Sequence, residues 1–312
     1  MIKRTLYFGN PSYLSLKNGQ LVLKLPEVEK NDTLPEAFKQ NNVKTFPIED
    51  IGYVILDHKQ ITITQGLLEE LLANNCAVIT CDSRCMPSGL LLPLESNILQ
   101  QERFSEQIKS SLPLRKQLWQ QTIIRKIENQ AAMLKRHTSA ETGNMEKWSK
   151  KVKSGDSENL EARAAAYYWS HLLPDIPDFS RKQDGDYPNN LFNYGYAILR
   201  AVVARALVAS VLLPTLGIHH HNRYNAFCLA DDIMEPYRPV VDEIILHVIH
   251  HFPEEKELSK EIKAELLQIP VTDVLINGQR SPLMVAASTT ASSLYKCYSK
   301  KSRRILYPTL LP

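Results

Sequence analysis

Hydrophobic and polar residues alternate over short distances in the first hundred residues of the chain. Four runs rich in β-branched, leucine and aromatic residues predict strands, at 4–9, 21–25, 53–56 and 77–81. The Asn18-Gly19 pair predicts a hairpin turn just before the second run. One helix interrupts the strands, with Thr64 as its N-terminal cap and a row of leucines as its apolar face. The pattern therefore predicts a β-rich N-terminal region.

From about residue 98 the pattern takes the period of a helix. Apolar residues recur at steps of three and four between Leu114 and Leu134, and Pro113 suits the first turn of that helix or a break between two helices. The polar, lysine-rich stretch 137–158 predicts a solvated loop or short irregular helices. Further helices are predicted at about 158–172, 190–213, 239–251 and 282–298. The sequence thus indicates an α+β protein, with a small β-rich domain at residues 1–90 and a larger all-α domain at residues 91–312.

The composition is that of a soluble globular protein, with 312 residues, 44% of them hydrophobic, and a net charge of +3. So small a charge does not by itself predict nucleic-acid binding, and any DNA contact must come from local clusters. Five cysteines, an odd number, favour free thiols in a reducing cytoplasm. The apolar run 197–213 contains Arg200 and Arg205, each costing about 2.5–3.5 kcal/mol at a bilayer centre. We therefore expect a soluble helix there, no membrane partner and a cytoplasmic location.

The segment Gly217-Ile218-His219-His220-His221 carries the strongest chemical signal. Gly217 follows a predicted helix end, so the histidines should lie in a loop, and in an extended loop His220 would point away from His219 and His221. Carboxylates are available downstream at Glu235 and upstream at Glu161. If Glu161, Glu235 and one of these histidines meet in space, one imidazole and two carboxylates form a divalent-cation site suited to phosphodiester chemistry. The plainer alternatives are a polar surface loop for the histidines and helix-dipole capping for Glu161.

The acidic residues around Glu235 can also be explained without a metal. Asp231, Asp232 and Glu235 should share one helix face, where a cation or Arg238 could neutralise them. Basic residues form two clusters, which are usually solvated surface but would suit DNA phosphates beside such a site. The clusters comprise Lys135, Arg136, Lys147, Lys150, Lys151 and Lys153, and then Lys300, Lys301, Arg303 and Arg304.

Several of these motifs together resemble the CRISPR-associated integrase family that catalyses spacer acquisition, and the resemblance spans the whole chain. One motif looks like the catalytic-glutamate helix of that family, a second like its helical core, a third like the loop that ends in its metal-binding histidine, and a fourth like its last acidic motif. In order they are Asn159 to Trp169, Asn189 to Leu199, Gly217 to His220, and Asp232 to Pro239. The form of the fourth motif resembles the type II branch of the family.

The resemblance implies specific roles, fold and partners. Glu161, His220 and Glu235 would be the metal ligands and catalytic residues for Mg²⁺ or Mn²⁺, with Asp232 in a supporting acidic position. The fold would be an N-terminal β-sandwich-like domain followed by an all-helical catalytic domain. Expected partners are double-stranded DNA, a second copy of the chain and a small ferredoxin-like CRISPR-associated protein. DNA contacts are expected at Lys150, Lys151, Arg238, Arg303 and Arg304.

The activity implied is insertion of a short DNA fragment, whose 3′-hydroxyl attacks a phosphodiester at a repeat boundary. Two alternatives stay open at this point. One is a metal nuclease that hydrolyses branched DNA with the same site. The other is a non-catalytic DNA-binding scaffold, in which the acidic cluster only neutralises Arg238 and caps helices.

Overall fold

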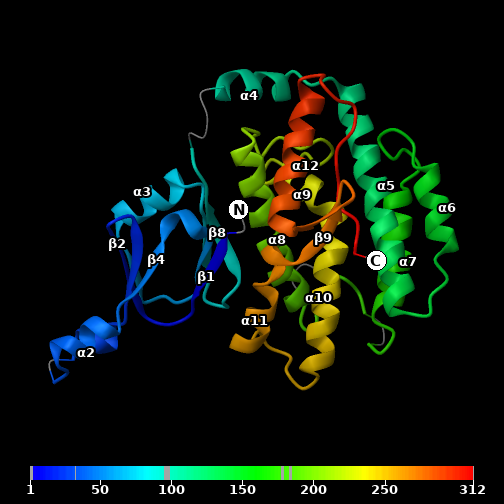
Figure 1. Cartoon of the computed structure of the whole chain (residues 1–312). Helices are drawn as coiled ribbons and strands as arrows, with labels where there is room; N and C mark the ends of the chain where they lie inside the picture. The colour runs from blue at the N-terminus through cyan, green and yellow to red at the C-terminus, as the bar shows by residue number, and fades with distance from the viewer. Residues whose placement is uncertain (1–2, 32, 95–98, 177–178, 183–184, 312) are drawn as a thin grey trace. The chain divides into compact units, whose positions relative to one another are not determined.

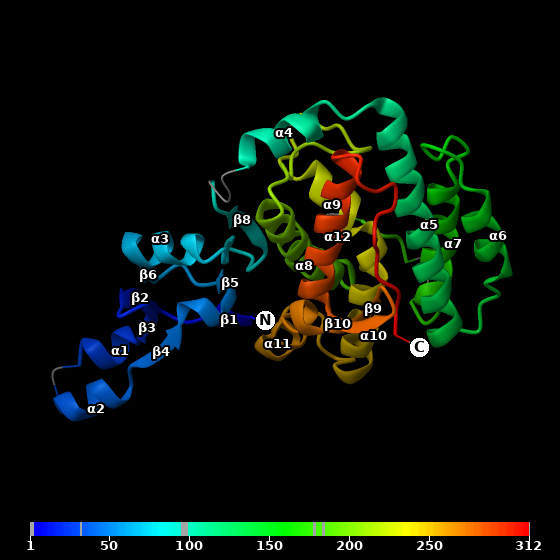
Figure 2. The ribbon, with the colours of Figure 1, turned by 45° about the horizontal axis from the view of Figure 1, so that its top comes forward.

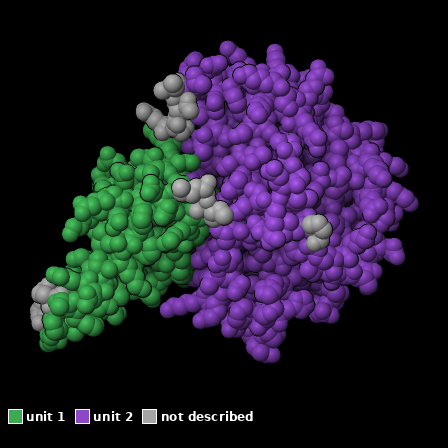
Figure 3. All heavy atoms as spheres, viewed as in Figure 1, with its two compact units in different colours: residues 1–96 green, residues 97–312 purple. Residues whose placement is uncertain are grey.

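The computed structural model describes residues 3–31, 33–94, 99–176, 179–182 and 185–311. The chain divides into two compact units, residues 1–96 and residues 97–312 (Figure 3). This boundary lies slightly beyond the one expected at residue 90. The first unit is β-rich and the second is mostly helical, which agrees with the α+β class expected from the sequence.

Two four-stranded sheets make up most of the first unit. One has the order β1-β5-β7-β8 and the other β4-β3-β2-β6. The strands are β1 (Arg4–Phe8), β2 (Ser12–Lys17), β3 (Gln20–Lys24), β4 (Lys44–Pro47), β5 (Ile51–Leu56), β6 (Ile61–Ile63), β7 (Ala77–Cys81) and β8 (Pro87–Leu91). The predicted hairpin is present, because β2 and β3 pair antiparallel and Asn18 and Gly19 both have positive φ, at 50° and 69°.

Both sheets of the first unit share one hydrophobic core with helix α3 (Gln65–Ala73). Leu14 and Leu21 enter it from one sheet and Val54 and Val78 from the other, while α3 contributes Leu67 and Leu71. This arrangement accords with the sandwich-like expectation. The short helices α1 (Pro26–Glu29), α2 (Glu36–Asn41) and η1 (Ile48–Asp50) fill the connection from β3 to β5.

Helices dominate the second unit. They are α4 (Gln100–Ile108), α5 (Leu112–His137), α6 (Gly143–Lys151), α7 (Leu160–Leu172), α8 (Asn189–Ala209), α9 (Cys228–Met234), η2 (Glu235–Tyr237), α10 (Arg238–His251), α11 (Lys260–Leu266), η3 (Ile269–Val271) and α12 (Leu283–Tyr298). The 26-residue α5 runs beside α6 and α7 in both ribbon views (Figures 1 and 2). It starts where Pro113 predicted, with Ser111 Oγ accepting a hydrogen bond from the backbone of Leu114.

The apolar helix α8 lies in the centre of this unit, packed against α9, α10 and α12. It is long and apolar enough to cross a membrane, but 78% of its most apolar window is buried inside the protein. Arg200, within it, pairs with Asp231 at 2.6 Å. The helix is therefore a core helix, as the two arginines in it predicted.

Two parts of the second unit differ from the sequence expectation. Stretch 137–158 contains a regular helix, α6, anchored by the buried side chains of Met145 and Ser149, one turn apart. In addition, β9 (Asp273–Ile276) and β10 (Gln279–Pro282) form an antiparallel hairpin, so this unit is not all-helical. The five cysteines are all free thiols.

A buried carboxyl group connects three helices of this unit. Asp242 on α10 accepts hydrogen bonds from the hydroxyls of Tyr168 on α7 and Tyr196 on α8, at 2.7 and 2.6 Å. Its side chain is 1% exposed, and burial is the main reason that its pKa is raised from 3.8 to about 6.

We expect this raised pKa to make stability fall as pH rises from about 4 to 6. In that window the native state retains a proton that the unfolded state has lost, and the ionised native form above it is destabilised by about 3 kcal/mol. Asp242→Asn removes the titration. In urea denaturation from pH 4 to 7, the variant should therefore gain stability relative to the parent as pH rises. A difference independent of pH would contradict this.

Candidate metal centre

Glu161 lies in the first turn of α7 without acting as its cap. Asp156, upstream of the helix, performs that role, because its two carboxylate oxygens accept from the backbone N–H groups of Leu160 and Glu161, at 3.0 and 2.9 Å. The hydrogen-bond cap is therefore Asp156, while Glu161 stays in the first turn, where its charge also suits the helix dipole. Its carboxylate meets the ammonium of Lys126 on α5, with Oε1 2.5 Å from Nζ.

Glu235 reaches the same ammonium from another element. It begins the short 3₁₀ helix η2, which contains Pro236 and leads directly into α10, and its side chain is almost fully buried. Its Oε2 lies 2.6 Å from Nζ of Lys126, and its Oε1 lies 3.0 Å from Arg238. Glu161 and Glu235 therefore converge on one position, from which the ammonium of Lys126 contacts both.

The charges of this cluster reinforce one another despite burial. Burial lowers the pKa of Lys126, but Glu235 and Glu161 outweigh it, so the pKa is raised overall. Burial likewise raises the pKa of Glu235, but Arg238 and Lys126 reverse this, so that carboxyl is held below its ordinary pKa. The two glutamates thus form an anionic position that a cation stabilises.

The three carboxylates of the predicted acidic face each have a different partner. Asp231 pairs with Arg200 of α8 and accepts a hydrogen bond from Asn225. Asp232 is completely buried and holds the histidine loop, with Oδ2 accepting from the backbone N–H of His219 at 2.9 Å. Only Glu235 faces Lys126. The expectation that all three share one neutralising cation is therefore wrong, because the loop and α8 each take one carboxylate.

His220 is fixed in orientation by Asp232. Its Nδ1 donates to Asp232 Oδ1 at 2.5 Å, and this hydrogen bond is the main reason that the pKa of His220 is raised. Because Nδ1 is engaged, Nε2 is the nitrogen left for a ligand. Glu235 and Glu161 raise the pKa of His220 further, as expected for an imidazole close to them.

His219 has a different task. Its ring stacks on Trp119 of α5, with centroids 4.1 Å apart and planes nearly parallel, while the ring of His220 meets the edge of the same indole at 5.5 Å. Burial lowers the pKa of His219. Both rings therefore contact one tryptophan, and the expected alternation of an extended segment is wrong because this loop is bent.

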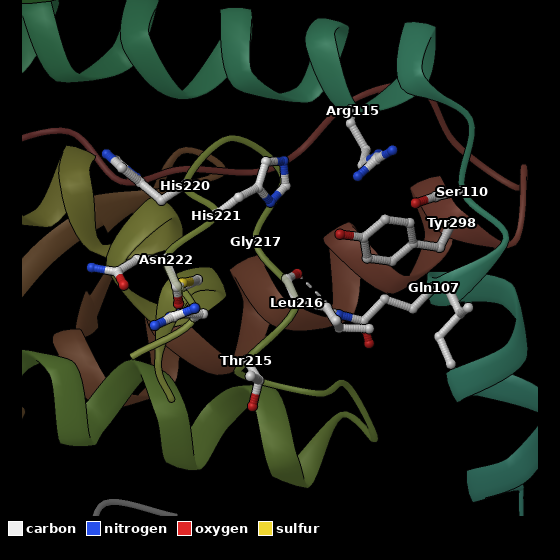
Figure 4. A pocket seen from close by; sticks show the side chains of 13 residues that line it. Gln107, Ser110, Arg115, Thr215, Leu216, Gly217, His220, His221, Asn222 and Tyr298 are labelled. Atoms are coloured by element: carbon white, nitrogen blue, oxygen red, sulfur yellow. Dashed lines mark hydrogen bonds between the residues drawn. The ribbon is translucent and has the colours of Figure 1, made fainter. Parts of the chain in front are cut away.

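A pocket of about 450 Å³ opens beside this loop (Figure 4). Figure 4 shows Arg115 of α5 and Tyr298 of α12 directed into the space beside residues 215–222. Its thirteen lining residues include Arg115, Arg223, His220 and His221 but no carboxylate. Among the residues that the structure describes, the buried Nε of Arg115 has no hydrogen-bond partner. The pocket is thus cationic on a face that adjoins His220.

A divalent cation fits this cluster by its donor chemistry. Among the described residues, the buried Oε2 of Glu235 has the Lys126 ammonium 2.6 Å away and no further hydrogen-bond partner. No three His, Cys, Asp or Glu side chains in the described ranges already stand as a ligand set. The ammonium of Lys126 lies between the two carboxylates instead. The roles of Glu161, His220 and Glu235 as metal ligands stay a prediction.

Comparison with known sequences decides the family. The profile of the family described as CRISPR associated protein Cas1 matches residues 7–257. A CRISPR-associated endonuclease Cas1 of Neisseria meningitidis is 33% identical over all of this chain and 98% of its own length. The chain belongs to the Cas1 family. A Cas1 endonuclease of Francisella tularensis subsp. novicida is also similar, 24% identical over 82% of this chain and 81% of its own.

Solved structures share the Cas1 fold. A casposase bound to integration product has a TM-score of 0.75 at 21% identity, covering 98% of this chain and 92% of its own. A Cas1 protein from Thermotoga maritima has a TM-score of 0.72 at 17% identity, covering 95% and 97%. The Cas6-RT-Cas1–Cas2 complex gives 0.71 at 19% identity, covering 96% of this chain and 35% of that one. The fold is therefore that of Cas1 proteins across both units.

The expected DNA contacts in this Cas1 family member fall into two groups. Lys150 and Lys151 are exposed at the end of α6, and Arg303 and Arg304 are exposed after α12. Arg238, in contrast, pairs with Glu235 and stacks over Tyr196, 4.7 Å from the ring centroid. Its charge is committed to the glutamate.

The sequence reasoning missed Lys126 and Trp119. Both lie on the buried side of α5, together with Thr122 and Asn129. Polar residues at positions 122, 126 and 129 recur at helical spacing on one face, and a buried polar row inside an apolar pattern is the signal that could have identified them.

Gly217 allows the histidine loop to pass close to α9. A Cβ at this position would lie 2.3 Å from the backbone oxygen of His220 and 2.9 Å from Asp232 Oδ2. We expect Gly217→Ala to displace His220 and, if His220 is a metal ligand, to lower metal-dependent activity on DNA by about 10- to 100-fold, since small misplacements of reacting groups are costly. Gly143→Ala, where a Cβ meets nothing within 4 Å, is the control. Equal activity of both variants in a joining assay would contradict the expectation.

Proposed function

We propose that this protein is a metal-dependent DNA integrase of CRISPR adaptation. The 3′-hydroxyl of a short DNA fragment would attack a phosphodiester at a repeat boundary, in a direct transesterification without a protein–DNA covalent intermediate. The observation that carries the proposal is the convergence of Glu161 and Glu235 on one cation position, next to an imidazole oriented by Asp232.

Glu161, His220 Nε2 and Glu235 would hold Mg²⁺ or Mn²⁺. A cation held by them would lower the pKa of the attacking hydroxyl and stabilise negative charge on the phosphoryl oxygens. Asp232 fixes the His220 ring, so its contribution is positional. The pocket beside His220 supplies Arg115 and Arg223 without any competing carboxylate, which suits a phosphodiester.

The names of the structural relatives support DNA as the substrate and a protein partner. The casposase is described as bound to integration product, and another relative as a complex that contains Cas1 and Cas2. By analogy we propose that this chain works as a homodimer, on double-stranded DNA, with a small ferredoxin-like CRISPR-associated partner. Its expected location is the cytoplasm.

The products of one reaction test the proposal. The protein and the small partner are incubated with supercoiled repeat DNA, Mg²⁺ or Mn²⁺, and a labelled fragment that ends in a 3′-hydroxyl or a 3′-deoxy nucleotide. Transfer of label to the repeat DNA only with the 3′-hydroxyl, and not in EDTA, is expected. Transfer that is unaffected by EDTA would disprove metal dependence.

Two other outcomes correspond to the alternative functions. Relatives are described as endonucleases, so a structure-specific nuclease is the second candidate. It would cut branched DNA with water as nucleophile and leave the label unjoined, even with the 3′-hydroxyl present. A DNA-binding scaffold would neither cut nor join. Lys126 and Arg238 already neutralise the glutamates without metal, which is the observation in favour of the scaffold.

The exposed basic residues should determine how binding depends on salt. Each arginine that contacts a phosphate contributes about 0.9 to the slope of log K against log salt. If both side chains contact phosphates, replacing Arg303 and Arg304 by alanine should lower the slope by about 1.8. Fluorescence anisotropy from 50 to 300 mM NaCl measures this. An unchanged slope would remove both residues from the DNA interface.

A further inference from the structure

Lys126 is one of two buried lysines among the described residues of the second unit. It lies in the interior of the 26-residue α5, and its side chain is 8% exposed. Its Nζ donates to Glu161 and makes the ion pair with Glu235, at 2.5 and 2.6 Å, from two elements far away in sequence. A buried lysine needs ion pairs such as these, because an ammonium loses its hydration on burial and is destabilised unless a partner compensates.

The lysine also solves a problem that the carboxylates create. Two carboxylates that face one point repel each other unless a positive charge lies between them, and here Glu235 is buried while the side chain of Glu161 is 28% exposed. Arg238 contacts only Oε1 of Glu235, and it leaves Oε2 and the whole of Glu161 to Lys126. Without that ammonium, the described structure gives Oε2 of Glu235 no other partner.

A divalent cation bound by the same oxygens cannot share their space with this ammonium. Magnesium lies about 2.0–2.1 Å from each ligand oxygen, and the Lys126 nitrogen already stands 2.5–2.6 Å from both oxygens. Two positive centres would then be closer together than electrostatic repulsion permits. The four-carbon stem of lysine is flexible, so the ammonium can withdraw while its backbone stays in α5.

We propose that Lys126 is an internal counter-ion, which keeps Glu161 and Glu235 assembled in the metal-free protein and must withdraw when a divalent cation binds them. This inference rests on the proposed metal site. It makes Lys126 a positioning residue, and it implies that the lysine weakens metal binding while it stabilises the empty site. The ammonium of Lys126 and a divalent cation therefore compete for the same two carboxylates.

Mn²⁺ binding to purified variants tests the competition directly. Free Mn²⁺ is counted by electron paramagnetic resonance at constant pH for the parent, Lys126→Met, Lys126→Arg, Glu235→Gln and a control, Lys263→Met. The control replaces another buried lysine of the same unit, on α11. Lys126→Met should bind Mn²⁺ at least 10-fold more tightly than the parent. Lys126→Arg, which keeps the charge, and Lys263→Met should stay close to the parent.

Thermal melting gives a second expectation for the same variants. Lys126→Met should melt several degrees below the parent in EDTA and recover most of that loss in Mn²⁺, because the cation then replaces the missing charge. The variant is therefore purified with Mn²⁺ present. Lys263→Met should show no such recovery.

The unaltered protein provides a measurement that does not depend on any variant folding. Acetylation of each lysine by an N-hydroxysuccinimide ester is followed by mass spectrometry in EDTA and in Mn²⁺. Withdrawal from the glutamates should make Lys126 react at least several-fold faster in Mn²⁺, while Lys263 stays unchanged.

The outcomes separate the two levels of inference. If the parent binds Mn²⁺ and Glu235→Gln does not, the metal site stands. The proposal that Lys126 is a counter-ion is then overturned if Lys126→Met binds Mn²⁺ no more tightly than the parent. It is also overturned if Lys126 is acetylated no faster in Mn²⁺ than in EDTA. If neither the parent nor Lys126→Met binds Mn²⁺, or if Glu235→Gln binds it as the parent does, the proposed site fails and the counter-ion with it.

Discussion

Replacing Glu161 with glutamine should abolish strand joining while DNA binding persists. The carboxylate meets the ammonium of Lys126, so its removal would take away a proposed metal ligand but leave Asp156 to cap α7 through hydrogen bonds. Loss of one group that stabilises the transition state typically costs about 10²–10³-fold in rate. Loss of a metal ligand should reach at least that range. The measurement is transfer of a labelled 3′-hydroxyl fragment into repeat DNA, with binding followed separately by anisotropy.

Glu158 provides the matched control for this substitution. It lies three residues before Glu161, is about half exposed and pairs with Lys153 at the surface. Glu158→Gln should therefore join DNA as the parent does. If Glu161→Gln joined DNA at the parent rate with normal metal dependence, the ligand assignment would be wrong. If it failed both to join and to bind DNA, the effect would be structural rather than chemical.

The elements with strong local signals were predictable from the sequence. The Asn18-Gly19 turn and the long apolar period of α5 specify their structures within a few residues, since neither depends on distant contacts. The second hairpin was missed although it has the same signal. Asn277 and Gly278 again have positive φ, at 50° and 75°, between β9 and β10. A search for Asn-Gly pairs along the whole chain would have found it.

The elements that depend on tertiary contacts were harder to predict. Helix α6 has few apolar residues, and only its packing on α5 and α7 buries Met145. The short strands β4 and β6 have three or four residues each, too few for a reliable periodic pattern. In these cases neighbours that lie far away in the sequence determine the structure.

The candidate site shows the same division. The resemblance to the family's motifs singled out Glu161, His220 and Glu235, and the structure places both glutamates on one ammonium and orients His220 through Asp232. What no spacing could provide is the partner of each group. Lys126 and Trp119 both lie on α5. Lys126 precedes its partner Glu161 by 35 residues. Their roles follow only from how α5 packs against the histidine loop and η2.

Replacing Trp119 with alanine is expected to be the most destabilising of these substitutions. The indole is 1% exposed, stacks on His219 and touches the edge of His220. Truncation of a buried aromatic side chain typically costs about 3–5 kcal/mol. The loss should appear as a lower midpoint in urea denaturation. Strand joining should fall as well, because the ring of His220 loses its contact with the indole.

Two further variants separate packing from ring stacking. Trp119→Phe retains a ring beneath His219, so it should lose less stability than Trp119→Ala and keep most joining activity. Trp148→Ala removes a tryptophan that is only half buried, on α6, where it contacts Arg163 and Tyr167. That variant should lose less stability than Trp119→Ala and leave joining unchanged. If Trp119→Ala lost stability but joined DNA like the parent under conditions where it is folded, the indole would support the fold alone, and the orientation of His220 would depend on Asp232.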